Sequence, residues 1–186
     1  MSRLEIKIGG FGGQGVILCG MIMGRAASIY DNKDATLTQS FGPEARGGAC
    51  SAQVVVSSER NLYPCVTQPD ILVVMSQPAY DKYITEIKPG ALVLFDEILV
   101  KPGPRPQGSR IYGIPATRFA EELGRSMVLN IVMLGFFTAL SNLVALDAMK
   151  KAVADSVPRG TLKLNEDAFM KGYNYGLELQ KQDNGH

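Results

Sequence analysis

The sequence predicts an α/β fold with a three-layer, Rossmann-like architecture: a mostly parallel sheet, helices on both faces and a helical C-terminal third. Three observations favour this fold. Candidate strands and helices alternate over the first two thirds of the chain. The segments 70–75 and 91–96 are continuous apolar runs apart from one terminal aspartate each, which is typical of strands covered on both faces. The chain has 186 residues, of which 46% are hydrophobic and 20% charged, so we expect one domain over residues 1–186.

The first elements are expected to form a βαβ unit. Leu4–Ile8 alternates apolar and polar residues, as a half-buried strand does, and a glycine-rich loop follows. An apolar helix is expected over 16–30 and a second strand over 35–40. The loop before the next strand, 51–57, is too short for a helical crossover. That strand should therefore run antiparallel to its neighbour or lie elsewhere in the sheet.

The remaining elements follow in order. After the strand at 70–75 we expect a helix at 77–87, a strand at 91–96 and a strand at 110–116. The next helix, 117–123, should take Thr117 as its N-cap, because a threonine hydroxyl can accept a hydrogen bond from a free helical N–H. Helices are then expected at 128–143 and 146–153. The last helix should begin at Asn165 as its N-cap.

The loop after the first strand has the spacing G-x-G-x-x-G and contains the candidate binding residues Gly10, Gly12, Gly13, Gln14 and Gly15. A strand before it and a helix after it are the context of a dinucleotide site. Such a site also needs an acid at the end of the second strand, where this chain has Gln39-Ser40-Phe41. A P-loop is excluded because G-K-[ST] is absent. Three alternatives remain: a dinucleotide site, another phosphate-bearing ligand, and close packing of helix on strand.

A second unusual loop, "TQSFGPEARGG", spans residues 38–48. It should leave the carboxyl end of the second strand, which is the edge where ligands gather in open α/β sheets. An alternative for Glu44 and Arg46 is a surface ion pair of little energetic value. The candidate binding residues of this loop are Ser40, Gly42, Glu44, Arg46, Gly47 and Gly48.

Several classes of protein are not expected from the composition. The net charge is +1 and no basic tract is present, so neither nucleic acid nor a membrane is expected as a partner. The three cysteines, at 19, 50 and 65, are too far apart to form a zinc or iron–sulfur motif. The single histidine is residue 186. We therefore expect no metal site and no catalytic residue, and a cytoplasmic location with reduced thiols.

The pairing of "GGFGGQGV" (9–16) with "TQSFGPEARGG" resembles the gamma subunit of 2-oxoacid:ferredoxin oxidoreductases, of the 2-oxoglutarate or 2-oxoisovalerate type. It is also similar to the corresponding domain of single-chain pyruvate:ferredoxin oxidoreductase. The resemblance extends over "QPDILVVMSQPAYDKY" (68–83), "LNIVMLG" (129–135) and "LNEDAFMKGYNYG" (164–176). It therefore covers essentially the whole chain, which is identified as a gamma-type domain.

The resemblance implies a reaction in which a 2-oxoacid, coenzyme A and oxidised ferredoxin give acyl-CoA, carbon dioxide and reduced ferredoxin. The family uses thiamine diphosphate and iron–sulfur clusters. This chain has neither the G-D-G…Asn pattern of a thiamine site nor clustered cysteines, so alpha and beta partner subunits should carry these cofactors; a delta subunit is left open. The isolated chain should bind no cofactor, be inactive and be capable of forming a homodimer. Ferredoxin would interact with this chain only through the assembled complex.

Within such a complex the two loops should complete the active site or the coenzyme A channel. Amides of Gly12, Gly13 and Gly15 could hold a phosphate, and Arg46 could pair with a carboxylate or phosphate. Hydrogen bonds to ligand or partner are expected from Gln14, Ser40 and Asn130. Three alternatives remain: the small subunit of indolepyruvate ferredoxin oxidoreductase, a stand-alone nucleotide-binding protein or NAD-dependent reductase, and a scaffold without a ligand.

Overall fold

A computed structural model describes residues 3–41, 49–59, 63–104 and 106–183. In these residues six strands form one sheet in the order β2-β3-β1-β4-β5-β6. The strands are β1 (Leu4–Phe11), β2 (Asp34–Phe41), β3 (Ala49–Ser57), β4 (Ile71–Val74), β5 (Leu92–Asp96) and β6 (Arg110–Ile114).

The sheet is mostly parallel, as predicted. β1, β4, β5 and β6 are paired in parallel, whereas β3 is antiparallel to both of its neighbours, β1 and β2. β2 and β1 therefore point the same way, as expected of the strands in a βαβ unit, but β3 lies between them. Of the two alternatives for the strand after the second loop, the antiparallel one is observed.

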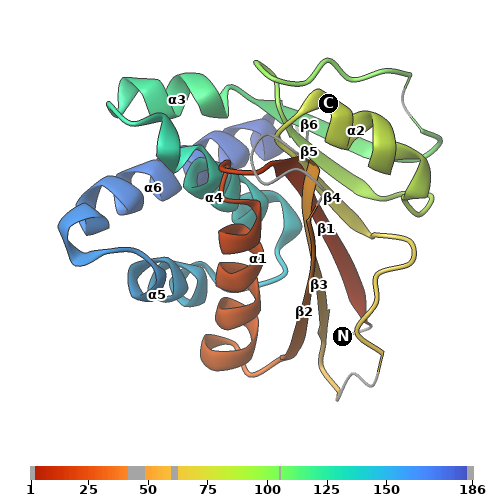
Figure 1. Ribbon diagram of the computed structural model, residues 1–186, viewed down its shortest axis with the longest axis horizontal. Coiled ribbons are helices and arrows are strands. Elements are labelled where there is room, and N and C mark those ends of the chain that lie inside the picture. Colours follow the sequence, from red (N-terminus) through yellow and green to blue (C-terminus); the bar gives the residue numbers. More distant parts are fainter. Residues whose placement is uncertain (1–2, 42–48, 60–62, 105, 184–186) are drawn as a thin grey trace.

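The helices cover the two faces of the sheet unequally (Figure 1). One face carries α1 (Val16–Arg25), continued as a π-helix (Ala26–Tyr30), together with α4 (Leu129–Ser141). Outside these lie α5 (Leu146–Ser156) and α6 (Leu162–Asp183), and α3 (Ala116–Glu122) packs on α4 and α6. The other face carries α2 (Gln77–Tyr83), which continues as a 3-10 turn (Ile84–Glu86). Further 3-10 turns precede α4 (Ser126–Val128) and α6 (Arg159–Thr161).

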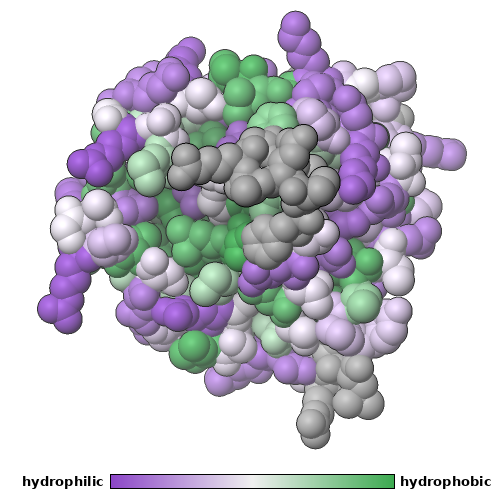
Figure 2. All heavy atoms as spheres, in the orientation of Figure 1, coloured by the Kyte–Doolittle hydropathy of each residue, from purple (hydrophilic) through white to green (hydrophobic). Residues whose placement is uncertain are grey.

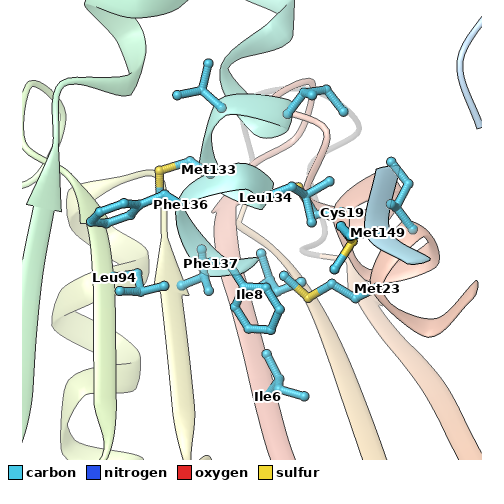
Figure 3. Packing of buried hydrophobic residues seen from close by; sticks show 14 of the residues in the cluster. Ile6, Ile8, Cys19, Met23, Leu94, Met133, Leu134, Phe136, Phe137 and Met149 are labelled. Carbon is cyan, nitrogen blue, oxygen red and sulfur yellow. The ribbon is translucent and has the colours of Figure 1, made fainter. Parts of the chain in front are cut away.

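The larger hydrophobic core fills the space between the sheet and the helical layer (Figure 3). Phe136 and Phe137 of α4 are fully buried there, against Leu94 and Ile8 of the sheet. This explains why α4 is apolar on every side: the sheet lies beneath it and α3, α5 and α6 surround it. A smaller cluster lies under α2 and includes Leu72, Val74, Tyr80 and Tyr83.

Two glycines allow α4 and α6 to cross at backbone contact. A Cβ atom at Gly135 of α4 would overlap the carbonyl oxygen of Phe169, and one at Gly172 of α6 would overlap that of Val132. Both neighbours are helix backbone, which cannot rotate away as a side chain can. The crossing fixes α4, and with it the residues at the start of α4, relative to the last helix.

Two predicted helix caps are wrong. α3 begins after Pro115, and Thr117 lies inside the helix, where its N–H and hydroxyl both donate to Asp96. α6 begins at Leu162, a turn earlier than predicted, and the Asn165 side chain donates to the Thr161 carbonyl oxygen at 2.8 Å. In both cases the polar side chain bonds to another partner, so it does not mark the helix start.

Candidate functional site

The candidate site lies at the carboxyl edge of the sheet, where β1 ends and the glycine loop begins. Gly10 of β1 is paired with Cys50 of β3, which is paired with Phe41 at the end of β2. The end of β2 and the beginning of β3, on either side of residues 42–48, therefore lie level with the start of the glycine loop. Ser40 is exposed on β2, opposite Ser51. The predicted residues Gly42, Glu44, Arg46, Gly47 and Gly48 lie outside the described residues.

The first glycine of the fingerprint is part of the strand. β1 continues through Phe11, three residues beyond its predicted end at Ile8. A Cβ at Gly10 would lie 2.7 Å from Oε1 of Gln14 and 2.9 Å from Cγ2 of Val16. A Cβ at Gly9 would lie 2.9 Å from Cβ of Ala79 in α2. At these two positions glycine is required by close packing, which is one of the alternatives considered above.

The Gln14 side chain bonds the loop to its own start and to Met75, which follows β4. Its Oε1 accepts a hydrogen bond from the Phe11 N–H at 2.6 Å, and its Nε2 donates to the Met75 carbonyl oxygen at 2.7 Å. The Met75 N–H in turn donates to the Gly9 carbonyl oxygen at 2.9 Å. Gln14, predicted to bond a ligand or partner, thus has both polar side-chain atoms bonded within the chain, and it shapes the loop.

The second half of the loop is open to solvent. Gly12 and Gly13 are exposed, and no atom lies within 4 Å of a Cβ placed at Gly13. Gly13 and Gly15 have φ angles of 99° and 75°, in the left-handed region that favours glycine. Gly13 and Gly15 are therefore glycines because the loop turns here, and the turn leaves the backbone of Gly13 exposed.

The N-terminus of α1 opens directly out of the loop. Its N-cap is Gly15, so no side chain caps the first N–H groups, and the first turn contains no acidic residue. Free amides and the helix dipole make such an end attractive to an anion.

Asn130, at the start of α4, lies against this helix end. It is 3% exposed; its Oδ1 accepts from the Ile131 N–H at 3.0 Å, and its carbonyl oxygen accepts from the Cys19 thiol. The Nδ2 atom lies over Gly15, where a Cβ would overlap it. Among the described residues, this Nδ2 has no hydrogen-bond acceptor. The predicted residues Gly15 and Asn130 are thus brought together from distant parts of the sequence.

Two hollows flank the start of α4. One, of about 270 Å³, borders the glycine loop and is lined by Gly13, Gln14, Leu99, Thr117, Ser126, Met127 and Leu129. The other, of about 300 Å³, lies between α1, α4 and the α5–α6 connection. Met127 lines both, and Asn130 lines the second. The first hollow unites residues that follow β1, β5 and β6, all at the carboxyl edge.

Asp96 is a residue of this edge that the sequence analysis missed. It is fully buried at the end of β5, where Oδ1 accepts from the Ile98 N–H at 2.9 Å and Oδ2 accepts from Thr117 at 3.0 Å. It therefore ties the β5–β6 connection to the start of α3. The available clue was an acid directly after the apolar run 91–95, since a buried carboxylate needs several donors.

Two of the three cysteines are buried. Cys19 and Cys50 are buried, and burial raises the pKa of Cys19 to about 12 and also raises that of Cys50. Within the described ranges, no three His, Cys, Asp or Glu residues are placed to hold a metal ion. None of the described helices is long and apolar enough to cross a membrane.

Comparison with known proteins defines the class first. Residues 5–175 match the family described as pyruvate ferredoxin/flavodoxin oxidoreductase, and the chain belongs to that family. The chain is 54% identical over 179 residues to the 2-oxoglutarate synthase subunit KorC of Methanocaldococcus jannaschii, covering 95% of this chain and 96% of that one.

Solved structures agree. The gamma subunit of a keto/oxoacid ferredoxin oxidoreductase from Geobacter sulfurreducens is similar with a TM-score of 0.83 and 40% identity, over 94% of this chain and 99% of that chain. The 2-oxoglutarate:ferredoxin oxidoreductase from Magnetococcus marinus, with 2-oxoglutarate, coenzyme A and succinyl-CoA bound, has a TM-score of 0.85 and 27% identity. The match spans 95% of this chain but 31% of the Magnetococcus chain. The predicted resemblance to gamma subunits of 2-oxoacid:ferredoxin oxidoreductases is confirmed, and the chain is a subunit of a multi-subunit oxidoreductase.

Proposed function

We propose that this chain is the gamma subunit of a complex that oxidises 2-oxoglutarate, or a closely related 2-oxoacid, and that its carboxyl edge completes the active site or coenzyme A channel of the partner subunits. The 2-oxoacid is chosen from the KorC relative and from the Magnetococcus enzyme, whose bound molecules are 2-oxoglutarate, coenzyme A and succinyl-CoA.

The partners in this proposal are alpha and beta subunits, with delta left open, and ferredoxin meets the complex as the electron acceptor. Thiamine diphosphate and iron–sulfur clusters are assigned to those partners, because this sequence contains neither a G-D-G…Asn pattern nor closely spaced cysteines. The part left to this chain is to bind and orient a substrate group.

One observation carries the assignment of that part: the uncapped N-terminus of α1 lies beside the side-chain amide of Asn130, whose Nδ2 has no acceptor among the described residues. The backbone at Gly13 is accessible, the first turn of α1 has no acid, and Asn130 Nδ2 lies over Gly15. These are neutral donors on a positive helix end, which suits a phosphate. Coenzyme A is the phosphate-bearing substrate of the reaction, so we assign this site to one of its phosphate groups.

Residues of the second loop are included in the proposal. Arg46 would pair with a phosphate or carboxylate in two-pronged fashion, and Ser40 would donate from its hydroxyl. Ser40 is the second-last residue of β2 and Arg46 follows that strand in the sequence; the end of β2 is in register with Gly10 through β3.

The test uses the assembled complex and the substitution Asn130→Asp. It replaces the free donor with a carboxylate of nearly the same shape, which should repel a phosphate. We expect the KM for coenzyme A to rise about tenfold or more, equivalent to at least ~1.4 kcal/mol, with the KM for the 2-oxoacid unchanged. Asn174→Asp, on the exposed side of α6, is the matched control and should change neither.

An Asn130→Asp complex that assembles with an unaltered melting temperature and an unaltered KM for coenzyme A would refute the phosphate assignment. Arg46→Ala is the companion variant. It should raise the same KM, and an unaltered value would remove Arg46 from the site.

A further inference from the structure

The carboxyl edge also carries exposed apolar side chains that the phosphate assignment does not use. Among the described residues, four of the seven exposed large hydrophobic side chains lie here, and we call them the carboxyl-edge patch: Phe11, Ile98, Leu99 and Met127. Met127 is 82% exposed, the highest value of the seven. Figure 2 shows green hydrophobic surface at the upper edge and near the start of α1, amid a largely purple periphery.

The patch surrounds the glycine loop. Leu99 and Met127 line the 270 Å³ hollow together with Gly13 and Gln14, and the Phe11 N–H bonds to Gln14. Ile98 precedes Leu99 in the β5–β6 connection, which Asp96 holds through the Ile98 N–H. The hydrogen bond from Ile98 to Asp96 therefore fixes the backbone that carries Ile98 and Leu99.

The patch has the composition of an interface centre. It combines a methionine and a phenylalanine with two aliphatic side chains, and methionine and aromatic residues are enriched where proteins dock. Covering an exposed methionine side chain with a partner is favourable by roughly 25 cal/mol per Å² of apolar area removed from water. Clustered exposed apolar residues of this kind mark a protein contact.

The relatives indicate what covers it. The Geobacter gamma subunit is a chain of nearly the same extent, whereas in the Magnetococcus enzyme the matching segment is 31% of the chain. The rest of the Magnetococcus chain is covalently joined to the matching segment. This chain is a subunit of a multi-subunit oxidoreductase, and we take its partner subunit to correspond to that remaining part of the Magnetococcus chain. An apolar docking surface beside the loop provides that contact.

We infer that the carboxyl-edge patch is the surface through which this chain docks on the partner subunit, with Met127 as the main anchor. The inference rests on the proposed function, in that the partner is the one whose active site the loop completes. Docking here would enclose the glycine loop, so the phosphate site would become shielded from water only in the assembled complex.

The experiment compares Met127→Glu with Ile29→Glu in co-expressed complexes. Ile29 is 62% exposed on the π-helix after α1, outside the patch, so it matches Met127 in exposure and in the charge introduced. Met127→Glu should weaken assembly at least tenfold in sedimentation velocity of the complex, with Ile29→Glu and Met127→Leu unchanged. Equal melting temperatures of the three isolated chains would show that all fold.

Two results would overturn the inference. One is a Met127→Glu chain that assembles as tightly as the wild type. The other is an isolated chain that forms a homodimer that Met127→Glu dissociates while hetero-assembly is kept, which would assign the patch to a second copy. The phosphate proposal is judged separately, because it predicts a raised KM for coenzyme A in Asn130→Asp complexes that assemble normally, whereas docking predicts that Met127→Glu lowers the amount of assembled complex.

Discussion

The side-chain nitrogen of Asn130 lies too close to the position that a Cβ atom would take at Gly15 for both atoms to fit. Gly15 therefore meets two requirements at once: its φ of 75° is left-handed, and the space beside its α-carbon is filled by the amide of a residue from another helix. A residue with a side chain would have to displace α4 or alter the start of α1.

Gly15→Ala is predicted to destabilise the protein by about 2 kcal/mol or more, since the left-handed conformation alone costs roughly 1–2 kcal/mol and the overlap with Asn130 adds to it. Urea unfolding of the two chains measures the difference. Gly24→Ala is the control: Gly24 lies within α1 with no atom within 4 Å of its Cβ position, so alanine should stabilise by about 0.5–1 kcal/mol. Equal stability of the Gly15→Ala chain and the wild type would contradict the described contact.

Gln14→Ala is predicted to loosen the glycine loop, because it removes the two hydrogen bonds that join Phe11 and Met75 to its side chain. At about 1 kcal/mol per bond, the loss should be roughly 1–3 kcal/mol. Hydrogen exchange at the Phe11 amide should accelerate strongly. Gln14→Glu keeps an acceptor for Phe11 but loses the donor to Met75, so its stability should lie between those of the wild type and Gln14→Ala. Undiminished protection of the Phe11 amide in Gln14→Ala would refute the role of this side chain.

Gly172→Ala is predicted to be among the most damaging small substitutions in the helical layer. The added methyl would meet the carbonyl oxygen of Val132, so α4 and α6 must separate, at a cost of about 3 kcal/mol. Thermal unfolding should show a clearly lower midpoint. Gly160→Ala, in the turn before α6 with no atom near its Cβ position, should leave the midpoint nearly unchanged. A shift no larger than that of the control would mean that the crossing has room to spare.

Cys19 is predicted to be inert to thiol reagents at neutral pH, because burial raises its pKa to about 12 and keeps it protonated in the folded chain. A colorimetric disulfide reagent at pH 8 should modify exposed Cys65 but leave Cys19 unmodified until the chain unfolds. Since the folded pKa exceeds the unfolded value of 9.0, the contribution to stability is complete below pH 9 and is lost as the pH rises from 9 towards 12. Cys19→Ala should flatten that decline; an equally steep fall would assign it to another group.

The sequence predicted the architecture well because its strongest patterns are periodic. The apolar runs within 70–75 and 91–96 became the parallel strands β4 and β5, and the antiparallel β3 is one of the two arrangements that the short second loop allowed. The place of β3, between β1 and β2, was not predictable, because its pairing with β1 joins segments far apart in the sequence and two arrangements satisfied the same loop length.

The prediction was less complete where one side chain can serve two purposes. Thr117 and Asn165 were assigned to helix caps, yet a hydroxyl or amide bonds to whichever donor or acceptor tertiary packing brings near, and here Asp96 and Thr161 supplied it. Gly10 belongs to the glycine pattern but lies in a strand. Gly15 and Asn130 were both predicted as site residues. Their contact was not predicted, because it depends on how α4 packs against α1, and the sequence pattern carries no information on that packing.

The contact between α1 and α4 also has a consequence for the order of biosynthesis. Cys19 and Asn130, bonded in the fold, are separated by 111 positions in the chain. At ~5–20 residues per second, a ribosome that has made the glycine loop needs on the order of ten seconds more to reach Asn130, whose side chain packs against Gly15. The α6 helix that holds α4 in place emerges later still. The nascent loop is therefore a turn at the end of an unfinished sheet, and the arrangement around Gly15 is among the last features of the fold to be assembled.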